Sequence, residues 1–117
     1  MILSFIMPRV GAQMDQGSIH KIIASVGDEL RPGTPLLEIR VDFGSAKAQD
    51  CPPLSFFRII ATERAHLRSL DVALGKLFAV GAQLGVAATD RNESIDGAAT
   101  RALRLTSVAI QIDPLSR

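Results

Sequence analysis

The sequence has little of what several protein classes depend on. It contains no tryptophan or tyrosine, and aromatic residues make up only 4% of it, which leaves few rings to stack on nucleic-acid bases. Its one cysteine, Cys51, excludes an internal disulfide framework and a cysteine-rich zinc site. Thirteen Lys and Arg against twelve Asp and Glu give a net charge of +1, far from the basic surplus of a general nucleic-acid binder. We therefore expect no nucleic-acid partner.

Long apolar runs are also missing. No stretch approaches the roughly 18 uninterrupted apolar residues that cross a bilayer. The apolar opening Met1–Ile6 has no basic region before it and ends at Pro8 and Arg9, which is not typical of a signal peptide. The chain of 117 residues suits one small domain. We expect a cytoplasmic protein without membrane contact, and a single thiol fits such a reducing compartment.

The first half consists of short apolar runs separated by glycine and proline. Runs rich in β-branched residues predict strands over Ile2–Met7, Ser18–Val26 and Pro35–Val41. Gly27-Asp28 and Arg31-Pro32-Gly33 predict the turns between them. The middle of the chain, Asp42–Pro53, is polar and closes with two prolines, which predicts a long loop. A further strand is expected over Leu54–Thr62.

The segment Thr62–Leu84 is compatible with two structures. Its leucines recur at helical spacing, but Gly75 and Gly81 would each cost about 1 kcal/mol inside a helix. The two glycines are six residues apart, as are Gly27 and Gly33, and GDELRPGTPLLEI and GKLFAVGAQLGVA look like two copies of one unit. An internal repeat of a strand–turn–strand unit favours strands. We therefore predict an all-β protein.

The C-terminal part, residues 90–117, is expected to be an extension of the domain. Its polar start, Asp90–Ser94, predicts a linker. Apolar residues then alternate with one slip of phase, which predicts an extra strand over residues 102–112 that carries a bulge. Such a strand could lie at a sheet edge or contact a partner.

Spaced residues across the first 43 positions resemble the lipoyl/biotinyl carrier domain, most closely the lipoyl domains of 2-oxo acid dehydrogenase acyltransferase subunits. Those residues are Met7-Pro8, Gly11, Met14, Gly17, Ile19, Gly27-Asp28, Gly33, Pro35-Leu36, Glu38-Ile39 and Asp42. Residues Ala65–Ala88 are similar to the second repeat of that family. The resemblance implies that residues 1–89 form a flattened β-barrel or sandwich of the barrel-sandwich hybrid type, with a pseudo-two-fold repeat.

The family attaches lipoate or biotin to one lysine at a hairpin tip, in an Asp-Lys-Ala context. By the resemblance, Asp42 matches the aspartate, but Phe43 occupies the acceptor position and Gly44 follows it. Phenylalanine has no amine, so the family's amide cannot form there. The hairpin is also longer than in the family, with an insert at about 44–57 that contains Lys47. The alternative acceptor is therefore Lys47, although a solvated loop lysine is the simpler interpretation.

No other residue set predicts catalysis or metal binding. His20 and His66 are the only histidines, and with one cysteine they do not form a typical metal set. A nucleophilic pair of Cys51 with His66 lacks an evident activating group. No paired carboxylates or glycine-rich phosphate loop is visible. We expect neither catalytic nor metal-binding residues.

These observations predict a degenerate, non-lipoylated lipoyl-like domain that is not an enzyme and carries no cofactor. It is expected to act as a binding or scaffolding module for a protein partner, as the resemblance implies beside a 2-oxo acid dehydrogenase or a related acyltransferase. The alternative is a swinging-arm acyl or carboxyl carrier with lipoate or biotin on Lys47. A third hypothesis is an adaptor whose strand 102–112 pairs with a partner sheet. A homo-oligomer is compatible with each.

Overall fold

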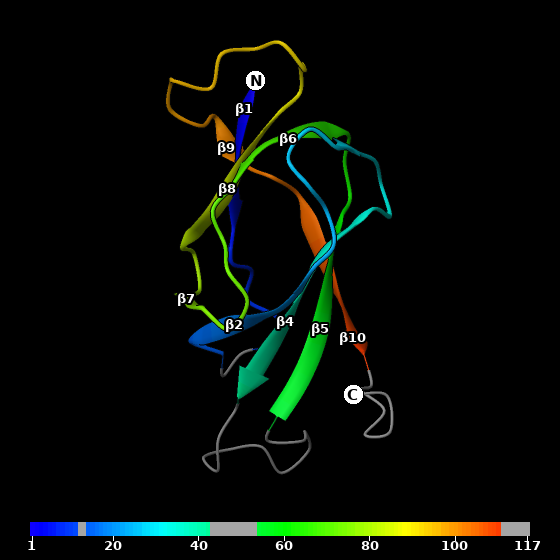
Figure 1. The fold of residues 1–117 in the computed structure, drawn as a ribbon, viewed down its shortest axis with the longest axis vertical. Helices are drawn as coiled ribbons and strands as arrows, with labels where there is room; N and C mark the ends of the chain where they lie inside the picture. The colour runs from blue at the N-terminus through cyan, green and yellow to red at the C-terminus, as the bar shows by residue number, and fades with distance from the viewer. Residues whose placement is uncertain (12–13, 43–53, 111–117) are drawn as a thin grey trace.

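The computed structural model describes residues 1–11, 14–42 and 54–110, and every regular element in them is a β-strand (Figure 1). The all-β prediction is confirmed, and Thr62–Leu84 forms strands and not a helix. The strands are β1 (Ile2–Ile6), β2 (Gln16–Ile22), β3 (Glu29–Leu30), β4 (Pro35–Asp42), β5 (Leu54–Ala61), β6 (Ala65–Leu70), β7 (Leu77–Ala79), β8 (Gln83–Ala88), β9 (Arg101–Ala102) and β10 (Leu105–Ile110).

The strands form two five-stranded sheets, each built from both halves of the chain. Sheet A has the order β3-β6-β8-β1-β9, and sheet B has the order β10-β5-β4-β2-β7. Each of β1 to β4 corresponds to the strand four places later in the chain, β5 to β8. If every strand of the order β3-β6-β8-β1 is replaced by its counterpart, the order becomes β7-β2-β4-β5, which is sheet B in reverse without β10. The added strands β9 and β10 hold matching places, next to β1 and β5. The two halves of the chain therefore have the same topology.

Backbone hydrogen bonds repeat between the halves with a fixed offset. The Gly27 N–H donates to the Leu67 carbonyl (2.8 Å), and the Gly75 N–H donates to the Ile19 carbonyl (2.8 Å), so that 27 and 75, like 19 and 67, differ by 48. The same offset relates three further pairs of bonds from an N–H to a carbonyl. They are Asp28 to Ser25 and Lys76 to Ala73, Thr34 to Arg31 and Ala82 to Ala79, and Ile23 to Leu36 and Asp71 to Leu84. Even the irregularities repeat, since the β2–β4 register shifts between Ile19 and Lys21 and the β6–β8 register between Leu67 and Ser69.

Four glycines with positive φ form the corresponding turns of the two halves. Gly27, Gly33, Gly75 and Gly81 have φ of 99°, 96°, 82° and 90°, a region that other residues enter only with strain. They are the two pairs that the sequence places six residues apart. The strand–turn–strand units predicted from these glycines are therefore present in the structure.

The core lies between the inner faces of the two sheets. Its fully buried large side chains come from both halves: Leu3, Phe5, Met7, Met14, Ile19, Leu30, Leu36, Leu37, Ile39, Ile59, Leu67 and Leu84. Burial of side chains of this size contributes about 1.5–3 kcal/mol each before the entropy cost of folding. The apolar alternation in the sequence is thus explained by one shared core.

The C-terminal extension differs from its prediction. In place of one strand over 102–112, the chain forms β9 in sheet A and β10 in sheet B, while residues 111 and 112 lie outside the described residues. Between these strands Leu103 enters the core and is only 3% exposed. The phase slip in the sequence therefore reflects a crossing between sheets, not a bulge within one strand.

Candidate functional site

The hairpin of β4 and β5 is where the resemblance places the family's acceptor. Asp42 ends β4 and pairs in register with Leu54, so residues 43–53 join two directly opposed positions. Phe43 and Lys47 fall in this segment, as does Cys51, and all three lie outside the described residues. The predicted insert reached 57, but residues 54–57 belong to β5. Asp42 is thus the described residue nearest to the predicted acceptor position.

A cavity of about 310 Å³ lies beside the end of β4, on the outer face of sheet B. Its lining residues come from β2, β4 and the turn into β7: Gln16, Gly17, Ser18, Arg40, Asp42, Gly75 and Leu77. The register explains this grouping, because Ser18 pairs with Arg40 on one side and with Leu77 on the other. The Ser18 hydroxyl donates to the Arg40 carbonyl at 3.5 Å.

The cavity presents a guanidinium, a carboxylate, an amide and a hydroxyl around an apolar side chain. A guanidinium recognises carboxylates and other planar anions, and the amide and hydroxyl can both donate and accept. This set suits noncovalent recognition of a polar group on a partner. Neither Arg40 nor Ser18 stands out as a site residue from the sequence alone. Polar residues at every second position of β4, Glu38, Arg40 and Asp42, were the available signal for an outward polar face.

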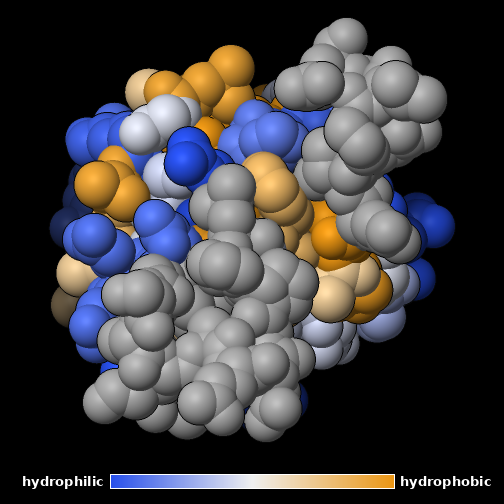
Figure 2. Space-filling view, turned by 90° about the horizontal axis from the view of Figure 1, so that it is seen from below, coloured by the Kyte–Doolittle hydropathy of each residue, from blue (hydrophilic) through white to orange (hydrophobic). Residues whose placement is uncertain are grey.

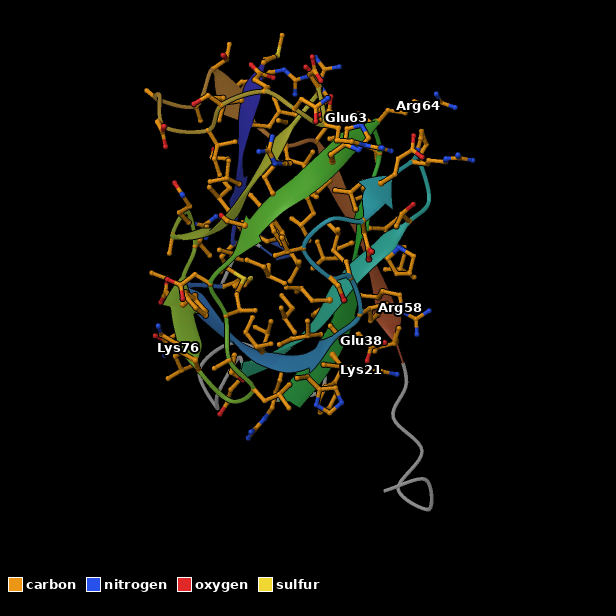
Figure 3. All side chains as sticks on the ribbon, turned by 45° about the horizontal axis from the view of Figure 1, so that its top comes forward. Lys21, Glu38, Arg58, Glu63, Arg64 and Lys76 are labelled. Carbon is orange, nitrogen blue, oxygen red and sulfur yellow. The ribbon has the colours of Figure 1, made fainter. Side chains whose placement is uncertain are left out.

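Next to the cavity, an ion pair between a buried glutamate and a partly exposed arginine joins β4 to β5 on the same face. The Glu38 side chain is only 6% exposed, and its Oε2 accepts hydrogen bonds from Arg58 Nε (3.1 Å) and Nη2 (2.9 Å). Lys21 of β2 pairs in register with Glu38, and Figure 3 shows Lys21, Glu38 and Arg58 close together. Because Arg58 balances Glu38, the two exposed cations Lys21 and Arg40 stand against the single carboxylate of Asp42, which leaves this outer face a small cationic surplus.

The two histidines lie in different sheets. His20 is exposed on β2, and its ring meets Phe56 edge-on with centroids 4.7 Å apart. His66 is in β6, opposite Glu29 and Ala88. Among the residues that the structure describes, no three or more His, Cys, Asp or Glu side chains gather closely enough to hold a metal. In this part of the chain there is also no helix with the length and apolar character to span a membrane.

The strongest electrostatic effect belongs to the extension and not to the hairpin. Glu63, in the β5–β6 turn, accepts hydrogen bonds from Arg101 Nη1 (2.7 Å) and Nη2 (2.6 Å) and from the Arg104 N–H (2.8 Å). The hydrogen bonds from Arg101 lower the pKa of Glu63 from 4.5 to about 2, against the opposing effect of burial. Glu63 thus acts as a clamp that holds both ends of the crossing at Leu103.

Comparison of the chain with protein-family models, curated proteins and solved structures finds no match. The assignment of a family and a function therefore depends on the residues and geometry described above.

Proposed function

We propose that the chain is a lipoyl/biotinyl-type domain of the barrel-sandwich hybrid kind that has lost its acceptor lysine and serves as a noncovalent binding or scaffolding module. The observation that carries this proposal is the repeat of hydrogen bonds with an offset of 48 residues. The family resemblance implies two equivalent turns at Gly27-Asp28 and Gly75-Lys76, and these turns make corresponding backbone bonds. The agreement supports the family proposal beyond the spacing of glycines alone.

The residue at the family's acceptor position favours a binding module over a carrier. Asp42 ends β4, and the next residue in the sequence, Phe43, has no group that can form an amide with lipoate or biotin. A chain without the amine cannot carry a swinging arm at this position. This favours noncovalent binding, which needs no enzymatic activity of its own.

The outer face of sheet B around the cavity is the proposed binding surface. Lys21 and Arg40 supply positive charge, and the Glu38–Arg58 pair links β4, the strand that carries Arg40, to β5. Exposed Leu77 adds apolar contact at the rim of the cavity. Such a face favours an acidic patch on the partner, because opposite charges steer the encounter. The resemblance makes a 2-oxo acid dehydrogenase component or a related acyltransferase the first partner to test.

The alternative function is a carrier modified on Lys47. The observation in its favour is that Lys47 belongs to the segment that joins Asp42 to Leu54, so it lies in the same hairpin as the family's acceptor. Its sequence context, Ser45-Ala46-Lys47-Ala48, differs from the family's Asp-Lys-Ala. Under this alternative the partner would be an enzyme that acts on the attached arm.

A quantitative co-purification tests the binding proposal. The tagged chain is isolated from its native host, and 2-oxo acid dehydrogenase components are quantified by mass spectrometry. We expect enrichment of such a component, and Arg40→Glu should reduce it by about tenfold because it reverses a charge at the binding surface. Arg31→Glu is the control, since Arg31 is 62% exposed in the turn before β4 and away from the cavity. Absence of these components, or equal loss in both variants, would contradict the proposed surface.

A further inference from the structure

In the part of the chain that the structure describes, the two sheets have four edges, and these differ in length. Sheet A ends in β3 and β9, with two residues each, and sheet B ends in β7, with three. The fourth edge, β10, has six residues, Leu105–Ile110. Proteins protect their edges with short strands, charged side chains or proline. The other three edges are short, whereas β10 is long and its sequence LTSVAI contains no charge, proline or glycine.

The backbone of β10 divides its hydrogen-bonding groups between two sides. The Thr62 N–H donates to the Arg104 carbonyl (3.1 Å), whereas the groups of Ala61 bond Gly33 and Thr34 on the β4 side. Bonding alternates along an antiparallel pair, so Thr106, Val108 and Ile110 direct their N–H and C=O groups to β5. The groups of Leu105, Ser107 and Ala109 point away from the sheet. Within the described residues β10 pairs with β5 alone.

The outer face beside this edge is apolar. Val108 is 47% exposed, and the half-buried side chains of Phe56, Ile60 and Ile110 surround it along β5 and β10. The nearest charged neighbour is Arg58, which pairs in register with Val108 and is held by Glu38 at 2.9 Å. The edge therefore offers no net charge with which to select a charged partner strand.

From this geometry we propose that β10 is the homodimer interface of the protein: it pairs antiparallel with β10 of a second copy and joins the two B sheets into one continuous sheet. The proposal is independent of the proposed function. A second copy fits the edge because the strand has no ionisable side chain, so two identical strands can approach without opposing like charges. A two-fold axis then makes the same contacts twice.

The outward backbone groups define the register. When the two-fold axis passes beside Ser107, Ser107 lies opposite Ser107 of the second copy. Leu105 then lies opposite Ala109 of the second copy. All three outward residues then form hydrogen-bonded pairs, whereas shifting the axis to Val108 leaves Leu105 without a partner in β10. On the outer face Val108 meets Thr106 of the second copy, beside Ile60. Figure 1 shows β10 along the side of the molecule, next to β5.

A cysteine cross-link tests both the interface and its register. Ser107→Cys is made in a Cys51→Ser background, so that the new thiol is the only one in the chain. Opposed hydrogen-bonded residues have Cα atoms about 5.5 Å apart, within the range of a disulfide. Mild oxidation should give a covalent dimer, while Ser25→Cys in the same background, at an exposed turn site, should give little. Equal cross-linking of the two variants would contradict the register.

Sedimentation equilibrium tests the dimer without cross-linking. From about 1 µM to about 1 mM, a range suited to small interfaces, the mass should rise from that of one 12.5 kDa chain to that of two. Ser107→Pro removes an outward N–H without breaking a bond to β5, which edge strands tolerate, and it should abolish the dimer. Val108→Lys should raise its dissociation constant by about tenfold, whereas Val26→Lys, at another exposed valine, should leave it unchanged.

Three results would overturn the proposal. The wild-type chain could remain a monomer over the whole concentration range. The dimer could persist unchanged in both Ser107→Pro and Val108→Lys, which would place the interface elsewhere. Finally, a chain that ends at residue 110 could dimerise while the full chain does not, which would mean that the last seven residues, 111–117, and not a second copy cover the edge. Circular dichroism of each variant checks that the fold is retained.

Discussion

The first half of the chain, β2 to β4, and the second half, β6 to β8, have the same backbone topology and hydrogen-bond pattern. They differ in their side-chain contacts and in the segments that follow them. At equivalent turns, the Asp28 carboxylate accepts a hydrogen bond from the Ser25 N–H (2.8 Å), whereas Lys76 lies over the Phe78 ring at 5.1 Å. The first half continues into the β4–β5 hairpin, and the second continues into residues 89–100 at the opposite end of the molecule, from which β10 runs back alongside β5 (Figure 1). The backbone hydrogen-bond pattern is thus repeated, whereas the surface side chains differ between the two halves.

The end of the molecule that bears the hairpin is also where exposed apolar side chains lie among polar ones, as Figure 2 shows. Exposed Leu77, the first residue of β7, lines the cavity together with Asp42 at the end of β4, so the second half contributes to the surface beside the first half's hairpin. Binding at this end would therefore use both copies of the repeat.

The largest expected effect concerns the hairpin that only the first half has. Phe43→Lys alone should remain essentially unlipoylated, because the family's alanine after the lysine is replaced by Gly44, a residue type with more backbone freedom, and because the 43–53 segment is longer than the family's tight tip. The same substitution with residues 44–53 replaced by a tight family-like turn should become a substrate, since a misplaced group loses orders of magnitude in rate. The measurement is intact mass after incubation with a lipoate-attaching ligase. Efficient modification of the single variant would show that the longer segment does not matter.

A smaller but still severe effect is expected at Gly85, where the halves differ inside the fold. A Cβ at Gly85 would collide with the backbone of Ser69 and Leu70, whereas the position 48 residues earlier accommodates Leu37. Gly85→Ala should cost about 3 kcal/mol or more, the upper range for overpacking. Urea unfolding measures it. Gly97→Ala is the control, because its Cβ would meet only Ile2 at 3.7 Å, and comparable losses in the two variants would contradict the argument.

The Glu63 clamp on the extension should show a pH dependence. Because folding lowers the pKa of Glu63 from 4.5 to about 2, its contribution is complete above pH 4.5 and is lost as the pH falls from 4.5 through 2. Glu63→Gln should cost about 1–3 kcal/mol at neutral pH and flatten that part of the stability curve. Chemical unfolding between pH 2 and pH 7 gives both numbers. Glu29→Gln, which breaks the exposed pair with Arg31, should change little, and an equal loss there would exclude a special role for Glu63.

The smallest effect is expected for alanine substitutions at the two equivalent turn glycines, and these compare the two halves most directly. Gly27→Ala and Gly75→Ala each place a side chain at positive φ with nothing within 4 Å, so the cost is conformational and not steric. Each should lower the free energy of unfolding by about 1 kcal/mol, and the two values should agree. Unfolding midpoints in urea provide the test. Values that differ severalfold would mean that the two turns are not energetically equivalent, although their backbone hydrogen bonds correspond.

The fold could be predicted to this extent because its signals are local. Glycines at fixed spacing demand the left-handed turns that Gly27 and Gly75 adopt, and short β-branched runs indicate the strands between them. The extension was predicted less well, because the burial of Leu103 depends on two sheets that the local pattern does not reveal.

The candidate site was harder to predict because it is assembled across strands. The cavity needs Ser18 and Arg40 to be opposite each other, and the Glu63 clamp joins residues 38 positions apart. Neither register nor long-range pairing can be derived from one sequence without a fold. The acceptor position, in contrast, was identified from Asp42 and Phe43 through the resemblance, and it stays a prediction.

The proposed function requires that the chain carries no covalent cofactor, and intact-mass analysis of the protein purified from its native host tests this most directly. The account predicts the mass of the unmodified sequence, with loss of Met1 as the only allowed change, and peptide mapping should find Lys21, Lys47 and Lys76 free. A lipoyl or biotinyl adduct on Lys47 would contradict the scaffold proposal and establish the carrier function in its place.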